Sequence, residues 1–233
     1  MSVLKHRIAA AFAIVTVASV ATFLQVQASH ETDDQFGEDA VWSASTDELN
    51  EIGKACKSPQ SNAYDQCFID EMGGYASSEA VAFSQLLTAQ KTPRVGYLTG
   101  IREAGLVDLG YVIYPGAGTS IPGWVLLNGV PALVNVDDLA VLPQSQMEND
   151  PQFAALRKIH PQLKLAVDND QRTPETSPPI QSLADGAQRF VLPYSLREDC
   201  ANCAPIAQAI FGFDFDASGA FLGAKFIAIT GQP

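Results

Sequence analysis

The chain has 233 residues, and its 26 acidic side chains against 14 Lys and Arg give a formal net charge of −12. A surface this acidic repels nucleic-acid phosphates and anionic lipid headgroups, so the composition argues against nucleic-acid partners. The length is sufficient for one domain with a sizeable hydrophobic core.

The first 28 residues have the pattern of a secretory signal peptide. Lys5 and Arg7 form a basic head, and an uncharged run of 17 residues, 8–24, follows them. The run is followed by a small-residue motif, which predicts cleavage between Ala28 and Ser29. An uncleaved membrane anchor is the alternative, because 17 residues is the lower limit for spanning a hydrocarbon core of about 30 Å.

Cleavage predicts export to the periplasm or the extracellular space, with no stable membrane insertion afterwards. The mature chain would have 205 residues and, without the basic head, a net charge of −14. Acidic side chains are concentrated in residues 31–72, which hold 11 Asp and Glu against Lys54 and Lys57. This segment predicts either a solvated face or a docking face for a basic partner.

Three helices are predicted near the start of the mature chain. Residues 29–44 are expected to form an extended leader, and residues 45–233 a single domain. The first helix begins at Ser45, which has a Glu three residues later, the spacing of a capping box. The second covers residues 62–72 and the third 78–87, both with apolar side chains at helical spacing.

The middle of the chain changes to strand periodicity. Residues 105–114 are rich in β-forming side chains. Two apolar runs, 124–127 and 130–136, flank Asn128-Gly129, the dipeptide that best tolerates the positive φ angles of a tight hairpin turn. This part of the sequence therefore predicts a strand followed by a β-hairpin.

The last third of the chain begins with a short helix and ends in three strands. Asp150 is followed by proline, a pair typical of a helix start. Residues 168–186 are polar and proline-rich, which predicts a mobile loop inside the domain. Apolar and polar side chains then alternate through 189–197, 207–216 and 220–229, as in antiparallel strands with one covered face.

Together these elements predict an α+β fold. A disulfide-clamped helical hairpin and a third helix are expected to pack on a mainly antiparallel, curved sheet of five to six strands. A curved sheet with helices on one face can enclose a pocket for a small ligand. Phe215, Phe221 and Phe226 are predicted either to line such a pocket or to belong to the core.

All four cysteines lie in the mature chain, and an oxidising compartment favours disulfides over free thiols. Cys56 and Cys67 lie near the facing ends of the first two predicted helices, so we expect a bond that clamps the hairpin. That pairing leaves Cys200 and Cys203 for each other. Crossed pairings, which would tie the hairpin to the sheet, stay open as the alternative.

The Cys-x-x-Cys motif formed by Cys200 and Cys203 is the one constellation that could carry redox chemistry. Redox pairs sit at a helix N-terminus, which stabilises the attacking thiolate. Here the residues after Cys203 alternate like a strand, and two acidic residues precede Cys200. Both features favour a structural bridge over a catalytic pair. A zinc site is disfavoured because the mature chain has only two histidines.

No metal, cofactor or catalytic site is predicted elsewhere. Asp214 opens a stretch that imitates a calcium loop, but the twelfth position, which needs a bidentate Glu, is Lys225. Asp137 and Asp138 are adjacent, so in a strand they point to opposite faces, and helix capping is the better role.

Because the sequence offers few candidate catalytic residues, it predicts a non-enzymatic module that binds a small ligand or an envelope protein. A periplasmic thiol–disulfide oxidoreductase that uses Cys200 and Cys203 is the alternative. A hydrolase whose carboxylates converge only in the fold is the third hypothesis.

Overall fold

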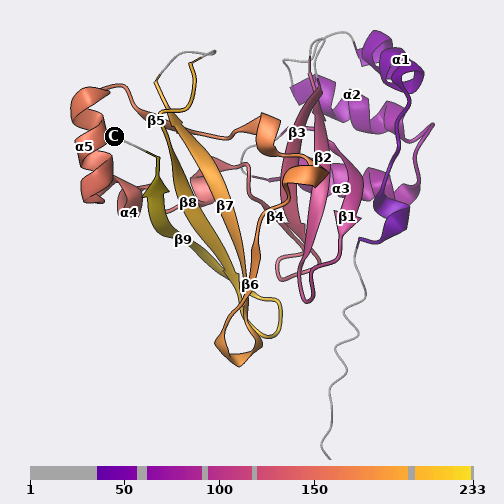
Figure 1. The fold of residues 1–233 in the computed structure, drawn as a ribbon. Coiled ribbons are helices and arrows are strands. Elements are labelled where there is room, and N and C mark those ends of the chain that lie inside the picture. Colours follow the sequence, from indigo (N-terminus) through magenta and orange to yellow (C-terminus); the bar gives the residue numbers. More distant parts are fainter. Residues whose placement is uncertain (1–35, 57–61, 91–93, 117–119, 199–202, 232–233) are drawn as a thin grey trace, which may run out of the picture. The chain divides into compact units, whose positions relative to one another are not determined.

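The computed structural model describes residues 36–56, 62–90, 94–116, 120–198 and 203–231 (Figure 1). The predicted signal peptide and its cleavage site at Ala28 and Ser29 lie outside these ranges and stay predictions. Among the described residues, no helix is long and apolar enough to cross a membrane.

The three predicted N-terminal helices are confirmed. They are α1 (Thr46–Cys56), α2 (Asn62–Met72) and α3 (Ser78–Thr88). The capping box of α1 is formed, because the Ser45 N–H donates to Glu48 Oε2 at 2.7 Å and the Glu48 N–H donates to Ser45 Oγ at 3.2 Å. The buried side chains that the three helices share in one core are Ile52, Tyr64, Phe68, Ile69, Met72 and Ala80.

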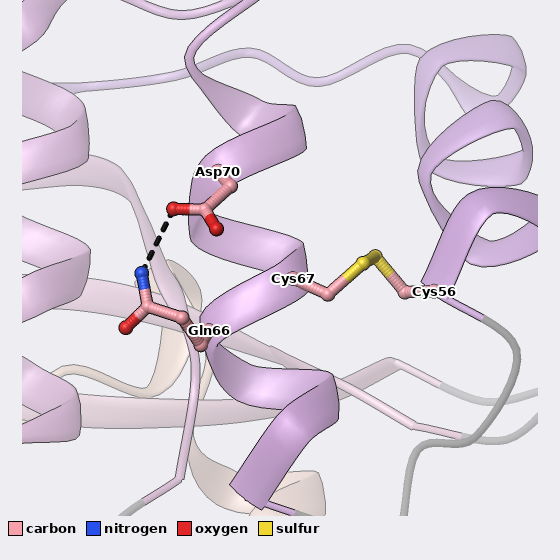
Figure 2. Close-up of a disulfide and its surroundings, with 4 residues drawn as sticks. All are labelled: Cys56, Gln66, Cys67 and Asp70. Atoms are coloured by element: carbon pink, nitrogen blue, oxygen red, sulfur yellow. Dashed lines mark hydrogen bonds between the residues drawn. A yellow bond between two sulfur atoms is a disulfide. The ribbon is translucent and has the colours of Figure 1, made fainter.

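A disulfide joins α1 to α2, as predicted (Figure 2). Cys56, the last residue of α1, bonds to Cys67 in α2, and their Cα atoms lie 5.6 Å apart. Along α2, Gln66 Nε2 donates to Asp70 Oδ1 at 2.8 Å, a pair at i,i+4 spacing that supports the helix. The hairpin is thus held by a covalent bond in addition to its apolar core.

The first sheet has four antiparallel strands in the order β1-β2-β3-β4. They are β1 (Tyr97–Arg102), β2 (Asp108–Pro115), β3 (Ser120–Leu127) and β4 (Leu133–Asn135). One face of this sheet packs against α3, whose Phe83 belongs to the same buried cluster as the strand residues Leu98, Val112, Val125 and Leu127.

The second sheet has five antiparallel strands. They are β5 (Lys164–Ala166), β6 (Ile180–Ser182), β7 (Gln188–Arg197), β8 (Ala207–Phe215) and β9 (Phe221–Thr230). The order is β5-β7-β8-β9, and β6 also pairs with β7. Side chains from both sheets form one buried core, which includes Leu109, Trp124, Leu126, Phe190, Leu192, Tyr194, Phe211 and Phe213.

The predicted α+β class and antiparallel pairing are confirmed, but the strands form two sheets rather than one. Between β4 and β5 the chain forms η2 (Leu139–Val141), α4 (Gln144–Glu148) and α5 (Pro151–Ile159). The predicted start of α5 is confirmed, since Asp150 Oδ1 accepts from the Gln152 N–H at 2.8 Å. Alternation in a sequence records which face of a strand is covered, and it does not record which strand lies beside it.

The turn at Asn128-Gly129 is wider than the predicted tight turn. β3 and β4 do pair, and Asn128 has the expected positive φ of 65°. The loop extends further because Val130 pairs with the β8–β9 turn. Its N–H donates to Gly219 O, and its carbonyl accepts from the Phe221 N–H, each at 2.8 Å. A contact with the second sheet therefore replaces a longer β4.

The described part of the predicted leader, residues 36–44, is tied to the fold. It contains the short turn η1 (Glu38–Ala40), and Phe36 and Trp42 are both buried. The Asn128 side chain accepts from the Phe36 N–H at 3.0 Å and donates to the Phe36 carbonyl at 3.1 Å. The Trp42 N–H donates to a carbonyl of β1 at 2.8 Å.

β9 lies at the edge of the second sheet. One of its N–H groups, that of Phe226, donates to Gln146 Oε1 of α4 at 3.3 Å. Leu222 and Ile227 on the same strand are exposed. The short helix α4 therefore covers part of an edge that also presents apolar side chains.

Replacement of Cys56 and Cys67 by serine should lower the free energy of unfolding by about 3 kcal/mol. The bridge spans 11 positions, and closing a loop of this size restricts the unfolded chain by roughly that amount. Urea unfolding followed by circular dichroism measures the change, with Ala55→Ser at an exposed neighbouring position as the control. A double variant as stable as the wild type would show that the bridge contributes nothing.

Candidate functional site

Arg172 is a cation buried in the core that the two sheets share. It follows the turn η3 (Asn169–Gln171), and the residue is 1% exposed. Charged side chains are rarely buried without partners, because removing a charge from water costs several kcal/mol. The groups that surround its guanidinium therefore define the candidate site.

The charge partner of Arg172 is Asp137, which follows β4. Arg172 Nε donates to Asp137 Oδ1 at 3.1 Å, and Asp137 Oδ2 accepts from the Trp124 N–H at 2.9 Å. Gly123 makes this approach possible, because a Cβ at this position would clash with the Asp137 carboxylate. Burial raises the pKa of Asp137, and this effect outweighs the opposing attraction of Arg172.

Two aromatic rings and a carbonyl complete the surroundings of the guanidinium. Arg172 Cζ lies 4.4 Å from the ring centroid of Trp124 and 5.0 Å from that of Tyr194. A desolvated cation over such a ring gains roughly 2 kcal/mol. Arg172 Nη2 also donates to Pro193 O at 3.3 Å. Pro193 lies in β7 between the residues paired with β6 and those paired with β5, so its missing N–H breaks no ladder there.

The site leaves two buried donors without an acceptor among the described residues. They are Arg172 Nη1 and Trp124 Nε1. Each unmet donor costs about 1–3 kcal/mol. The Tyr194 hydroxyl is satisfied, since it donates to Val136 O at 2.6 Å, and burial raises its pKa so that it stays neutral. The guanidinium of Arg172 is therefore buried against its partners, but not all of its N–H groups are hydrogen-bonded.

Residues 168–177, here called the strap, carry Arg172 and bond to both sheets. At one end Ser195 Oγ of β7 donates to Asp168 Oδ2 at 2.9 Å. At the other end the hydroxyls of Ser177 and of Tyr111 in β2 lie 2.7 Å apart. In Figure 1 the strap belongs to the orange part of the chain between β5 and β6.

The strap lies within residues 168–186, the segment predicted to be a mobile loop. In the structure this segment contains η3, η4 (Pro174–Thr176), β6 and η5 (Ala184–Gly186). Because Arg172 is buried, this segment contributes a side chain to the core in addition to connecting two strands. Its mobility stays a prediction.

The cysteine motif is described only in part. Cys200 lies outside the described residues, so the Cys200–Cys203 bridge stays a prediction. Cys203 precedes β8, and residues 203–215 contain no helix. The described residues that follow the motif therefore offer no helix N-terminus that could stabilise a thiolate.

The predicted capping role is confirmed for Asp138 and is wrong for Asp137. Asp138 Oδ1 accepts from the Ala140 N–H at 3.0 Å and caps η2, whereas Asp137 pairs with Arg172. The two side chains do not converge on a common site. Among the described residues, no group of three His, Cys, Asp or Glu side chains could hold a metal ion.

Asp214, the first residue of the calcium-loop imitation, is held by two cations. Arg189 donates to Asp214 through Nε at 2.5 Å and Nη2 at 2.8 Å, and Lys225 Nζ lies 2.8 Å from Asp214 Oδ2. The hydrogen bonds from Arg189 are the largest cause of the lowered pKa of Asp214. This stretch therefore forms an ion-pair network across β7, β8 and β9.

The three phenylalanines considered as a pocket lining are packed against other rings. The ring centroids of Phe215 and Phe221 lie 5.2 Å apart, and those of Phe211 and Phe226 lie 5.7 Å apart. Phe215 itself is fully buried. These contacts favour the core interpretation of the three residues.

Comparisons of the chain with protein-family models, with curated proteins and with solved structures find no match. The interpretation of the site therefore depends on its geometry. Sequence reasoning missed Arg172, because a single arginine in a polar, proline-rich segment carries no periodic signal. Trp124 lies in the apolar run 124–127, a pattern that predicts only a strand of the hairpin.

Arg172→Met should destabilise the protein by about 3–5 kcal/mol at neutral pH, because the buried Asp137 carboxylate loses its cation. The pKa of Asp137 is already raised in the folded state and should rise further. Protonation of Asp137 removes the unpaired buried charge, so the loss of stability should shrink as the pH falls from about 7 to about 4.5. Urea unfolding at both pH values measures this difference.

The matched control for that experiment is Arg157→Met. Arg157 is exposed, and its Cζ lies 5.8 Å from the ring centroid of Phe153. Its replacement should cost less than about 1 kcal/mol at either pH. Equal losses in the two variants would contradict a special role of the buried ion pair.

Asp214→Asn should lower stability by about 1.5–3 kcal/mol at neutral pH, since it removes charge-assisted hydrogen bonds. Because the folded pKa of Asp214 is lowered, its stabilisation is present above the unfolded pKa and is lost as the pH falls through the folded pKa. The variant should therefore lose less stability than the wild type between about pH 4 and about pH 2. Thermal unfolding across this range tests it, with exposed Glu103→Gln as control. Parallel pH profiles would refute the assignment.

Proposed function

We propose that this protein is exported and acts as a non-enzymatic, disulfide-stabilised module that binds a small ligand. The observation that carries the proposal is the buried seat formed by Asp137, Trp124, Tyr194 and Pro193. A carboxylate, two ring faces and a carbonyl that converge in a water-poor site are the groups that recognise small cationic ligands.

Export is supported by two features of different kinds. The N-terminal sequence has the pattern of a cleavable signal up to Ala28, and the Cys56–Cys67 bridge is of the type that persists in oxidising compartments. Periplasm or extracellular space is therefore the proposed location. The acidic composition keeps nucleic acid out of the proposed set of partners.

A binding role is favoured over catalysis because a serine of β7 and the histidine at the end of α5 serve structural contacts. Ser195 Oγ donates to Asp168, and His160 Nδ1 lies 3.1 Å from Glu198 Oε1 at the end of α5. The alternative oxidoreductase would need an activated thiol at Cys200. The strand that follows Cys203 does not supply the helix N-terminus that lowers a thiol pKa.

Fractionation of cells that express the full-length chain tests the proposal. We expect the protein outside the cytosol, with Ser29 as its first residue and all four cysteines oxidised when intact and peptide masses are measured. Recovery from the cytosol with Met1 retained and free thiols would refute export. An insulin-reduction activity that Cys200→Ser abolishes would replace the binding proposal by the oxidoreductase.

A further inference from the structure

We propose that the seat of Arg172 is a binding site for the guanidinium group of a ligand, and that the strap holds Arg172 there as an internal competitor. The inference rests on the proposed binding function and names its ligand class and its regulation.

The seat fits a guanidinium group better than other cations. Asp137 and Pro193 offer oxygen acceptors. The ring centroids of Trp124 and Tyr194 lie 4.4 and 5.0 Å from Arg172 Cζ, the central carbon of the guanidinium. A planar, weakly hydrated guanidinium can use acceptors and ring faces together. A lysine-type ammonium is a strongly hydrated point charge and gains less from the rings.

The groups of the seat are positioned by the sheets and not by the strap. Asp137 is oriented by the Trp124 N–H at 2.9 Å and has room because position 123 is glycine. The Tyr194 ring is fixed by its hydrogen bond to Val136 O. Withdrawal of Arg172 therefore leaves the carboxylate and the rings in place, which preorganises the site for a second guanidinium.

The contacts of Arg172 in the seat do not use all of the hydrogen-bond donors of its guanidinium. Arg172 Nη1 has no acceptor among the described residues, and the contact with Asp137 uses Nε alone. Arg172 is the one buried residue of the strap, and the other nine are half-buried or exposed, so no other strap side chain has to leave the core with it. A ligand that is free of the chain can rotate to use more of its donors, and the acidic chain attracts cations. In the wild type, the apparent affinity for such a ligand is then the affinity of the empty seat multiplied by the fraction of molecules in which Arg172 has left it.

Rescue of Arg172→Ala by methylguanidinium tests the site. We expect the Tm of this variant to rise by roughly 2–4 °C once methylguanidinium exceeds its dissociation constant about fivefold. The neutral analogue N-methylurea, of nearly the same shape, should give no such shift. Methylguanidinium that stabilises the variant no more than N-methylurea would overturn the proposed site.

Two further variants identify where the rescue occurs. Adding Asp137→Asn to Arg172→Ala should abolish the response, whereas Arg157→Ala alone should show none. A response that survives Asp137→Asn would place the ligand elsewhere and overturn the inference. If Arg172→Ala alone does not fold, the recovery of folded protein on refolding with methylguanidinium or N-methylurea replaces the Tm as the readout, with the same two outcomes.

Hydrogen exchange of the wild-type protein tests displacement of the strap. Methylguanidinium and an arginine-containing peptide should each speed exchange of the amides of residues 169–177 relative to those of α5. Rescue of the variant without any change in wild-type exchange would reduce Arg172 to a structural side chain and overturn the competitor role. Fractionation and the insulin-reduction assay test the proposed function independently of both results, so a failure here is distinguishable from a failure of the proposed function.

Discussion

The buried ion pair between Arg172 and Asp137 is the constraint that fixes the strap against the two sheets. Removing both charges from water is costly, and their attraction offsets that cost only when the hydrogen bonds and ring contacts are made together. An apolar pair of equal volume would tolerate several arrangements. The ion pair tolerates few, and so it fixes where the strap lies against β3 and β7.

Buried and half-buried polar side chains position other irregular segments in the same way. Asn128 binds the backbone of Phe36 through both atoms of its amide. Gln188 in β7 donates to Ala104 O at 2.7 Å and accepts from the Val107 N–H at 3.3 Å, which fixes the turn before β2. A few amides and charges therefore decide how loops and sheets meet.

The elements that could be predicted from the sequence are those with local signals. Ser45 and the helical spacing after it mark α1, and the spacing of Cys56 and Cys67 marks the bridge. The division into two sheets has no local signal, because β5 and β6 are only three residues long. The seat of Arg172 has no local signal either, because its groups come from three separate segments and each group is ordinary in its own segment.

The edge position of β9 has a consequence for the solubility of the protein. A long edge strand with free backbone groups and the exposed side chains Leu222 and Ile227 is a template for pairing with other chains. Gln146 occupies one N–H of this edge from a helix of only five residues. Undocking of α4 would open a route to intermolecular β-sheets and fibrillar aggregation while the rest of the fold is still intact.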